Sequence, residues 1–394
     1  MNKKTLKDID VKNKRVIVRV DFNVPLDKNL DITDDSRIKG ALPTIRYLMD
    51  NNAKTVLMSH LGRPKGRVKE ELRLAPVAKR LGELLGIDVK KPDECVGGKA
   101  AKIVSGMKPK DVVLLENLRF HPEEEANDPE FAKQLASFAD IFVNDAFGTC
   151  HRAHASTEGI TKYLPSAAGF LVGKEIEYFE KVTKNPDKPY VAILGGAKVS
   201  DKIAVITNMI DKVDAILIGG AMAYTFLKSE GVNIGNSKLE ADKIGLAKEI
   251  LEKAKSVNVR VLLPVDHIVA GRVDADAETE TVDNEIPEGK IGLDIGPKTI
   301  KEFKGVLKNA RTVVWNGPVG FFEIKLFSKG TEELANFLAA SGAVTIIGGG
   351  DTAAAVNKLG LSGKMSHIST GGGASLEYLE GKALPGITAL EDKR

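Results

Sequence analysis

Short runs of apolar, mostly β-branched residues alternate along this chain with longer amphipathic stretches rich in alanine, leucine and lysine. The runs of the first half are Arg15–Val20, Thr55–Met58, Asp111–Leu115 and Asp140–Val143. Hydrophobicity that is nearly continuous, rather than alternating, is typical of parallel strands covered by helices on both faces. The pattern therefore predicts an α/β protein built on doubly wound parallel sheets.

Composition limits the classes of protein that this chain can belong to. Its 394 residues are enough for roughly two or three domains, each with its own core, and its net charge of +3 creates no field that would attract nucleic acid. Two cysteines, Cys95 and Cys150, indicate a reducing compartment. The first residues lack the apolar core of a signal peptide, and no apolar run is long enough to span a bilayer. We expect a multidomain cytoplasmic protein without nucleic-acid or membrane partners.

The sequence between the strands contains helix start and stop signals. Residues 34–36 can cap a helix that runs through Leu48, and Asp128-Pro129 should start a helix over residues 131–138. Ala167–Lys184 is predicted to be one helix, which the prolines of the segment 185–189 would end. We place the domain boundary at this helix and its proline-marked turn.

Polar and cationic side chains follow the strands of the first half. They are Asp21 and Asn23 after the first strand, His60 and Arg63 after the second, Arg119 after the third and Arg152 after the fourth, with Arg37 in the first turn of a helix. Parallel strands end at one edge of a sheet, and ligands bind at that edge. A solvated surface side chain explains any one arginine equally well. The whole set favours a small, multiply anionic ligand, because guanidinium groups match phosphate and carboxylate oxygens.

Strands of the second half run into glycines where helices begin. The glycine-rich segments after these strands are 195–196, 219–220, 316–320, 348–350 and 371–373. Such junctions leave backbone N–H groups unpaired at the positive end of a helix, where they can bind an anion. Plain tight turns also use glycine, but several such turns on one sheet edge favour a phosphorylated ligand.

Two lysines strengthen the prediction of an anion site. Ser200 is a candidate cap for a helix to about Ile210, which would place Lys202 in the first turn, beside Lys198 and its glycine turn. A cation at the positive end of a helix is unfavourable. It is better explained by a bound negative charge, although most lysines are simply solvated.

Several other chemistries do not fit. No segment has the Gly-x-x-x-x-Gly-Lys-Ser/Thr spacing of a P-loop or the Gly-x-Gly-x-x-Gly spacing of a dinucleotide site. His151 and His154 have no matching ligand set for zinc, and Cys150 beside His151 is more simply an incidental small residue than a nucleophile. Asp351 can be a helix N-cap or, beside a phosphate turn, a ligand of Mg²⁺.

A non-catalytic nucleotide-binding or scaffolding protein is the alternative from a different class. It would explain the glycine turns but gives no reason for the arginines of the first half. Calorimetry separates the two hypotheses, because a binder without activity should bind nucleotide but not a small phosphorylated acid.

The longest motifs resemble one family along essentially the whole chain, in collinear order. The segments that match phosphoglycerate kinases are Arg19–Pro25, Ser59–Pro64, Glu116–Phe120, His151–Ser156, Gly195–Lys198, Trp315–Pro318, Gly348–Thr352 and Ser369–Ser375. The resemblance implies two similar-sized Rossmann-like domains joined by a helix. It places a phosphoglycerate domain at 1–170, a connector at 171–189, a nucleotide domain at 190–380 and a tail at 381–394 that returns to the first domain.

The resemblance also implies which residues bind the ligands. Those carried over for 3-phosphoglycerate or 1,3-bisphosphoglycerate are Asp21, Asn23, Arg37, His60, Arg63, Arg119 and Arg152. Those carried over for the adenine and ribose of ATP or ADP are Gly196, Ala197, Gly219, Gly220, Gly292, Leu293, Pro318 and Glu323. Those carried over for the nucleotide phosphates are Lys198, Lys202, Asn316, Gly349, Gly350 and Thr352, with Asp351 as the ligand of Mg²⁺.

The implied reaction is reversible phosphoryl transfer from 1,3-bisphosphoglycerate to MgADP, by hinge closure of a monomer. We expect Arg37, Lys198, Lys202 and the backbone amides of Gly350 and Gly372 to surround the transferred group. Two positions depart from the family pattern, because Cys150 and Ala221 stand where alanine and glycine are more usual. Ala221 would slightly crowd the adenine pocket.

Overall fold

The computed structural model describes residues 2–393. The chain forms two compact units, one that extends to Glu177 and resumes at Ala383, and one that comprises Tyr178–Lys382. The chain passes from the first unit to the second within helix α6 (Phe170–Lys184). Both units are built on parallel sheets, so the predicted α/β class is confirmed.

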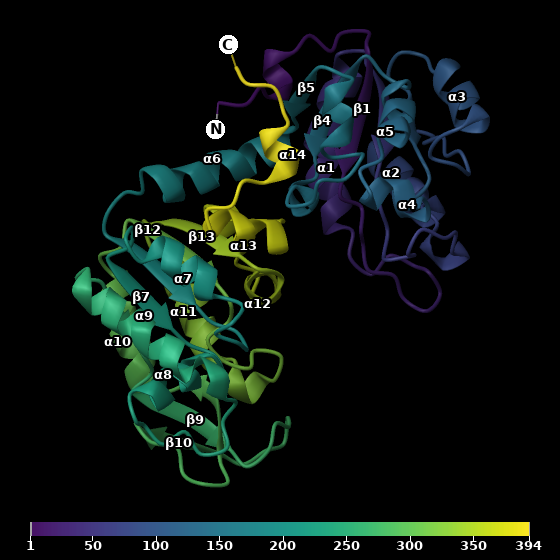
Figure 1. Ribbon diagram of the computed structural model, residues 1–394. Coiled ribbons are helices and arrows are strands. Elements are labelled where there is room, and N and C mark those ends of the chain that lie inside the picture. The colour runs from purple at the N-terminus through teal and green to yellow at the C-terminus, as the bar shows by residue number, and fades with distance from the viewer. Residues whose placement is uncertain (1, 394) are drawn as a thin grey trace. The chain divides into compact units, whose positions relative to one another are not determined.

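The first unit contains a five-stranded sheet in the order β3-β2-β1-β4-β5, and all neighbouring strands pair in parallel. The strands are β1 (Arg15–Val20), β2 (Lys54–Met58), β3 (Val112–Leu114), β4 (Ile141–Asp145) and β5 (Ser166–Ala168). The helices are α1 (Ser36–Asp50), α2 (Ala75–Leu85), α3 (Gly98–Ser105), α4 (Pro122–Glu125), α5 (Pro129–Ala136) and α14 (Pro385–Thr388). Figure 1 shows helices on both sides of this sheet, which explains why its strands are apolar on both faces.

The second unit contains a six-stranded parallel sheet in the order β14-β13-β12-β6-β7-β8. Its strands are β6 (Tyr190–Leu194), β7 (Ala215–Ile218), β8 (Arg260–Leu262), β12 (Thr312–Asn316), β13 (Val344–Gly348) and β14 (His367–Ile368). Its helices are α7 (Ile203–Met209), α8 (Ala223–Ser229), α9 (Ile244–Ser256), α10 (Pro297–Leu307), α11 (Lys329–Ala339), α12 (Gly350–Lys358) and α13 (Gly373–Leu379). A separate antiparallel sheet contains β9 (Asp266–Ala270), β10 (Thr279–Asp283) and β11 (Ile291–Ile295).

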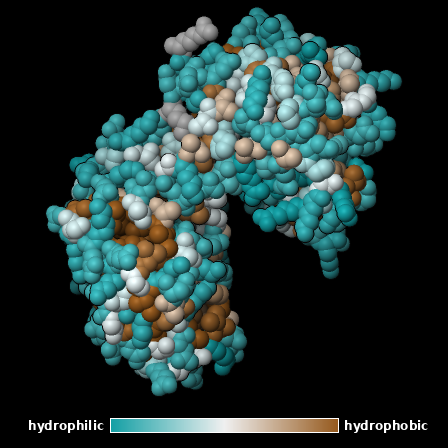
Figure 2. Space-filling model, in the orientation of Figure 1, coloured by the Kyte–Doolittle hydropathy of each residue, from teal (hydrophilic) through white to brown (hydrophobic). Residues whose placement is uncertain are grey.

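Short 3₁₀ helices complete the element list. They are η1 (Leu6–Asp8), η2 (Glu70–Leu72), η3 (Leu118–Phe120), η4 (Phe147–Thr149), η5 (Gly159–Lys162), η6 (Ala241–Lys243), η7 (Lys325–Phe327) and η8 (Ser362–Lys364). No helix within residues 2–393 is long and apolar enough to cross a membrane. On the face shown in Figure 2, hydrophobic residues gather in patches on the second unit, whereas the first unit is mainly hydrophilic.

Two predictions about helix starts were wrong. The segment 166–168 is strand β5, so α6 begins at Phe170 rather than Ala167. Its first turn is bound by side chains, because Leu171 N donates to Asp145 Oδ1 at 2.9 Å and Phe170 N donates to Thr44 Oγ1 at 2.9 Å. Ser200 does not cap α7, since its hydroxyl donates to Glu240 at 2.6 Å. Lys202 occupies the N-cap position instead.

The end of the chain packs on the first unit. Leu384, Ile387 and Leu390 are at most 2 % exposed. Gly386 N donates to Cys150 O at 2.9 Å, and its carbonyl accepts from Asn144 Nδ2 at 2.8 Å. Lys3 pairs with Asp392, so the first and last described residues lie close together (Figure 1).

Candidate active site

The ends of β1 to β4 gather most of the predicted anion-binding side chains of the first unit. Arg37, on α1, forms an ion pair with Asp21, which directly follows β1. Asn23 Oδ1 accepts from Gly62 N at 2.8 Å, and Arg119 Nη1 donates to Gly62 O at 2.9 Å. Gly62 therefore ties the loops after β1, β2 and β3 to one another.

Of the other predicted side chains, Arg152 lies near this cluster, whereas Arg63 forms no hydrogen bond or ion pair with it in the described part of the chain. Arg152 is one of the charges that lower the pKa of Arg119, after burial itself. The Nε atom of Arg152 lies 3.2 Å from His151 Nε2. Arg63 is exposed in the loop after β2 and makes no hydrogen bond or ion pair to the other predicted residues within residues 2–393.

The electrostatics of this sheet edge are strongly positive. Burial and then the charges of Arg19, Arg119 and Arg37 hold the pKa of His60 well below its usual value. Burial and then the charges of Arg19, Arg119 and Arg152 lower the pKa of His154 to about 4. Both imidazoles are therefore neutral near pH 7, and the positive charge resides in arginines, which suit an anionic ligand.

Arg19 was missed by the sequence-based analysis. It is 1 % exposed, near the end of β1, and its Nη2 atom lies 3.0 Å from His60 Nδ1. Its Nε atom donates to Ser156 Oγ at 2.9 Å. The only signal in the sequence was an arginine inside an apolar strand, which is costly to bury unless it is paired.

Close packing of backbone requires several of the second-unit glycines. A Cβ atom on Gly195 would lie 2.1 Å from Pro318 O, and one on Gly219 would lie 2.6 Å from Val319 Cβ. Gly220 N donates to Val319 O at 2.9 Å, and Gly196 N donates to Pro318 O at 3.0 Å. The structure thus brings the turns after β6, β7 and β12 together, including four of the residues predicted for the adenine pocket.

The other residues predicted for the nucleoside lie on neighbouring segments. Gly292 and Leu293 belong to β11, and Phe321 N donates to Leu293 O at 2.8 Å. This bond places Leu293 beside the segment that carries Glu323. Ala197 and Glu323 are exposed, and Glu323 has no hydrogen-bond partner in the described part of the chain.

The turn between β13 and α12 leads directly into a helix start, as its glycines predicted. Gly349 has φ 85° and is the N-cap residue, and α12 begins at Gly350. Thr352 Oγ1 accepts from Gly317 N at 2.7 Å, which ties this turn to the end of β12. Lys202 Nζ bonds to Asn316 Oδ1, so Lys202 lies next to the same strand end.

Lys202 lies in an unusual environment for a lysine. Its side chain is 9 % exposed, and burial lowers its pKa, while the charges of Asp201 and Asp351 act in the opposite direction. Lys198 is exposed and has no ion-pair partner in the described part of the chain. Gly372, with φ 50°, is the N-cap residue of α13, the second helix start at this edge.

The donor chemistry suits a metal that arrives with a phosphate ligand. Asp351 lies in the first turn of α12, beside unpaired N–H groups. No group of three or more potential ligands occurs within residues 2–393. Mg²⁺ commonly uses one or two carboxylates together with substrate phosphates, so Asp351 fits Mg²⁺ bound with a nucleotide.

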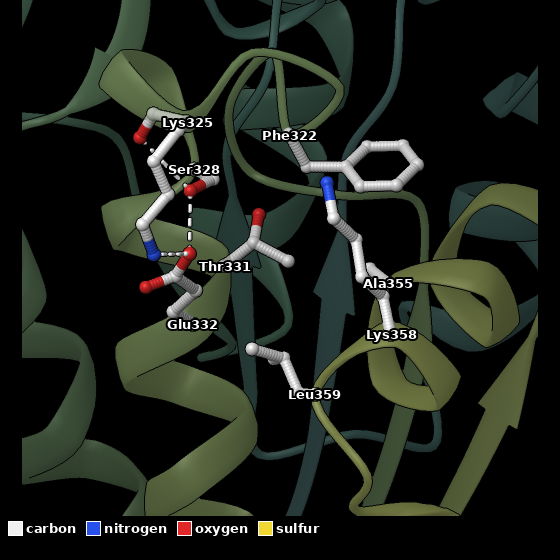
Figure 3. A pocket seen from close by; sticks show the side chains of 8 residues that line it. All are labelled: Phe322, Lys325, Ser328, Thr331, Glu332, Ala355, Lys358 and Leu359. Atoms are coloured by element: carbon white, nitrogen blue, oxygen red, sulfur yellow. Dashed lines mark hydrogen bonds and ion pairs between the residues drawn. The ribbon is translucent and has the colours of Figure 1, made fainter.

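A cavity of about 180 Å³ lies beside the second half of α12, where Ala355 and Lys358 line it. Figure 3 shows it between α11 and α12, lined by Phe322, Ala355 and Leu359 among others. None of the predicted ligand-binding residues lines this cavity. It is therefore separate from the glycine turns.

Two Rossmann-like units, one with a cationic sheet edge and one with glycine turns at helix starts, define a phosphotransferase of two halves. The family model described as phosphoglycerate kinase matches residues 6–382. The chain is 58 % identical over 394 residues to phosphoglycerate kinase of Moorella thermoacetica, with all of both chains covered. It is 59 % identical over 397 residues to that of Prosthecochloris aestuarii, again with both chains fully covered.

Solved structures agree. The structure of phosphoglycerate kinase from Coxiella burnetii has a TM-score of 0.90 at 42 % identity, and that from Pyrococcus horikoshii has a TM-score of 0.86 at 35 % identity. Each covers 98 % of both chains. The chain belongs to the phosphoglycerate kinase family. It is a kinase of glycolysis, a transferase whose acceptor is a carboxyl group, as the resemblance implied.

Proposed function

We propose that this chain transfers a phosphoryl group reversibly from 1,3-bisphosphoglycerate to MgADP, giving 3-phosphoglycerate and MgATP. The observation that carries the proposal is the division of the anion-binding groups between two sheet edges. The first unit offers guanidinium groups, which suit a small acid with several anionic groups. The second offers close-packed glycine turns and helix starts, which suit a nucleotide.

The phosphoglycerate side comprises the cluster held by Gly62 and the Asp21–Arg37 pair. Asn23, Arg63, Arg119 and Arg152 bind the acid, and His60 contributes a neutral imidazole. Because the acceptor is a carboxylate that is already deprotonated near pH 7, the reaction needs no general base. A neutral histidine among arginines fits that chemistry, since positioning and charge neutralisation do the catalytic work.

The nucleotide side comprises the joined turns after β6, β7, β12 and β13. The adenine is held by Gly196, Ala197, Gly219, Gly220, Gly292, Leu293 and Pro318, and the ribose by Glu323. Lys198, Lys202, Asn316, Gly349, Gly350 and Thr352 bind the phosphates, and Asp351 holds Mg²⁺. When bound, the Mg²⁺ ion neutralises charge on the phosphate oxygens.

The transferred group is surrounded by Arg37 from one unit and by Lys198, Lys202 and the Gly350 and Gly372 amides from the other. Because acceptor and donor bind to different units, closure about the connecting segment brings them in line and excludes water. We further propose that the protein is a cytoplasmic monomer without nucleic-acid or membrane partners. The small net charge supports the absence of a nucleic-acid partner, and the two buried, unpaired cysteines support a reducing compartment.

A coupled assay tests the function directly. The purified protein is incubated with 3-phosphoglycerate and MgATP, and the 1,3-bisphosphoglycerate formed is reduced by an added dehydrogenase with NADH. We expect NADH oxidation that requires both substrates and Mg²⁺. Calorimetry that shows nucleotide binding, together with no turnover and no binding of 3-phosphoglycerate, would support the non-catalytic alternative instead.

A further inference from the structure

His60 is held from behind by a buried arginine. The imidazole is 5 % exposed, and its Nδ1 atom lies 3.0 Å from Arg19 Nη2. Within residues 2–393, no other residue forms a hydrogen bond to the Nε2 atom of His60. One side of the ring is therefore bound within the protein, and the other is available to a ligand.

The chemistry of the two groups decides which nitrogen carries the proton. A guanidinium has five N–H donors and no acceptor, so Arg19 can only donate in this contact. His60 Nδ1 must then be the acceptor and carry no hydrogen. A doubly protonated imidazolium would place two donors face to face at 3.0 Å. The contact is compatible only with a neutral ring that carries its hydrogen on Nε2.

Arg19 is itself fixed by a chain of buried contacts. Its Nε atom donates to Ser156 Oγ at 2.9 Å, and that hydroxyl donates to Glu124 Oε1 at 2.6 Å. Glu124 is fully buried on α4 and also accepts from Ser156 N at 3.0 Å. Ser156 thus links the Arg19 guanidinium to the Glu124 carboxylate, which compensates its charge. Because these contacts hold the guanidinium in place, the Nη2 donor that faces His60 has a single orientation.

We propose that Arg19 is a positioning residue that fixes His60 as a neutral Nε2–H donor directed toward the phosphoglycerate. In this arrangement His60 supplies a directional hydrogen bond, while Arg37, Arg63, Arg119 and Arg152 supply the charge. The state of the ring follows from the contacts of Arg19 alone. That the donor meets phosphoglycerate rests on the function proposed above.

The groups around His60 reinforce its neutral state over a wide pH range. The charged groups that face it are Arg19 on β1, Arg37 on α1 and Arg119 after β3, and His154 lies nearby after β4. Burial and these cations all act to lower the pKa of His60. Protonation of His60 should therefore not contribute to the pH dependence of substrate binding near pH 6.5.

Nuclear magnetic resonance of the ligand-free, full-length protein tests the state of the ring. Long-range ¹H–¹⁵N correlations distinguish the two neutral tautomers from the imidazolium, and His60→Gln assigns the signal. We expect the Nε2–H tautomer alone, without titration between pH 8 and about pH 5. An Nδ1–H tautomer, a mixture, or protonation near pH 6.5 in the unmodified protein would overturn the proposal.

Two matched variants test whether Arg19 is the cause. Arg19→Met removes the donor but keeps an apolar side chain in the strand, and we expect a mixture of both tautomers. Arg15→Met, at the other end of the same strand, removes an exposed arginine paired with Asp140 at 3.3 Å and should leave the signal unchanged. A pure Nε2–H tautomer in folded Arg19→Met would show that Arg19 does not fix the ring.

Kinetics test the connection to the substrate. Arg19→Met should raise the KM for 3-phosphoglycerate about tenfold, the loss of one good hydrogen bond, with the KM for MgATP unchanged. A purely structural defect would alter both constants or neither. If the tautomer is as expected but 3-phosphoglycerate neither binds nor turns over, the proposed function fails and the assignment of the ring stands.

Discussion

Within residues 2–393, Arg37 is held at the sheet edge by a single carboxylate, and its exposed guanidinium can meet a ligand. Its side chain is 40 % exposed, and its partner Asp21 directly follows β1. Exposed ion pairs contribute at most about 1 kcal/mol to stability. The Arg37→Ala variant should therefore fold normally but lose about 100-fold or more in kcat, because a positioned cation no longer meets the transferred group.

The measurement pairs steady-state kinetics with calorimetry of MgADP binding. The affinity for MgADP should be nearly unchanged, since the residues proposed to bind the nucleotide belong to the other unit. Arg15→Ala, at the opposite end of β1 from Asp21, provides a control with unchanged activity. A parallel loss of nucleotide binding would show that Arg37 supports the fold or binds the other ligand.

At this scale the sequence predicted polar side chains that gather at one sheet edge, such as Asp21 and Arg37, but it did not predict the buried Arg19. Asp21 and Arg37 follow a strand end and a helix start, positions that the topology rules bring to one edge. Arg19 lies within the apolar run Arg15–Val20, where nothing in the sequence shows the Ser156 and Glu124 contacts that allow its burial. Those contacts come from segments more than 100 positions away and exist only in the folded chain.

At the scale of elements, the turn before α12 separates two hypotheses for Asp351. Gly349 is the N-cap residue, so Asp351 is not, and its contribution to the helix is limited to the interaction with the helix dipole, about 1 kcal/mol or less. Asp351→Ala should therefore weaken MgADP binding strongly while lowering the unfolding free energy only slightly. Calorimetry with and without EDTA checks the metal role.

With Mg²⁺ removed, the unmodified protein and Asp351→Ala should bind ADP with similar affinity. Asp201→Ala, on the exposed segment before α7, serves as a control for loss of one negative charge nearby. If the difference between Asp351→Ala and the unmodified protein persists in EDTA, Asp351 acts on the turn itself and not through a metal.

The start of α6 makes the stability of the first unit depend on pH. Burial raises the pKa of Asp145 from its ordinary 3.8 to about 6, because its bonds to Thr44 and to the first amides of α6 only partly offset the loss of water. A carboxyl whose pKa is raised on folding adds stability below its unfolded pKa and loses it as pH rises through the folded pKa. The loss between about pH 4 and pH 6 amounts to roughly 3 kcal/mol.

Urea unfolding at pH 4.5 and pH 7.5 measures this effect in the unmodified protein and in Asp145→Asn. The asparagine does not titrate. Relative to the unmodified protein, the free energy of unfolding of Asp145→Asn should therefore rise by about 2 kcal/mol from pH 4.5 to pH 7.5. Equal pH dependence in both proteins would contradict an elevated pKa for Asp145. Asp140→Asn, at the other end of β4, provides an exposed control.

The elements that the sequence predicted are those with strong, continuous hydrophobicity. The adjacent strands β1 and β2 were predicted to within one residue, as Arg15–Val20 and Thr55–Met58. The antiparallel sheet was missed, since β10 is the mostly exposed Thr279–Asp283, whose polar residues carry no strand pattern. Ala167 and Ala168 of strand β5 were predicted to be helical, in keeping with the helix propensity of alanine, but pairing with β4 determines their conformation.

At the scale of the whole molecule, the last residues complete the first unit. The tail contributes three nearly fully buried aliphatic side chains, Leu384, Ile387 and Leu390, and each is worth about 1.5–3 kcal/mol when buried. Gly386 also bonds to Asn144 and Cys150, in the segment that leads to Arg152. This burial is comparable with the net stability of a typical domain. The tail is therefore part of the fold of the first unit, although the whole of Tyr178–Lys382 separates the two in the sequence.

A protein truncated after Lys382 should therefore lose the first unit selectively. We expect it to bind MgADP with nearly normal affinity and to lose 3-phosphoglycerate binding and turnover, because the second unit keeps its own core around Trp315 and Phe303. Calorimetry with each ligand, together with circular dichroism, measures the outcome. Truncation after Glu391 is the control, since it keeps all three buried aliphatic residues and should retain both activities. If the protein that ends at Lys382 still binds 3-phosphoglycerate, the first unit folds without its tail. The stability lost with the three aliphatic side chains would then be compensated by other contacts of that unit.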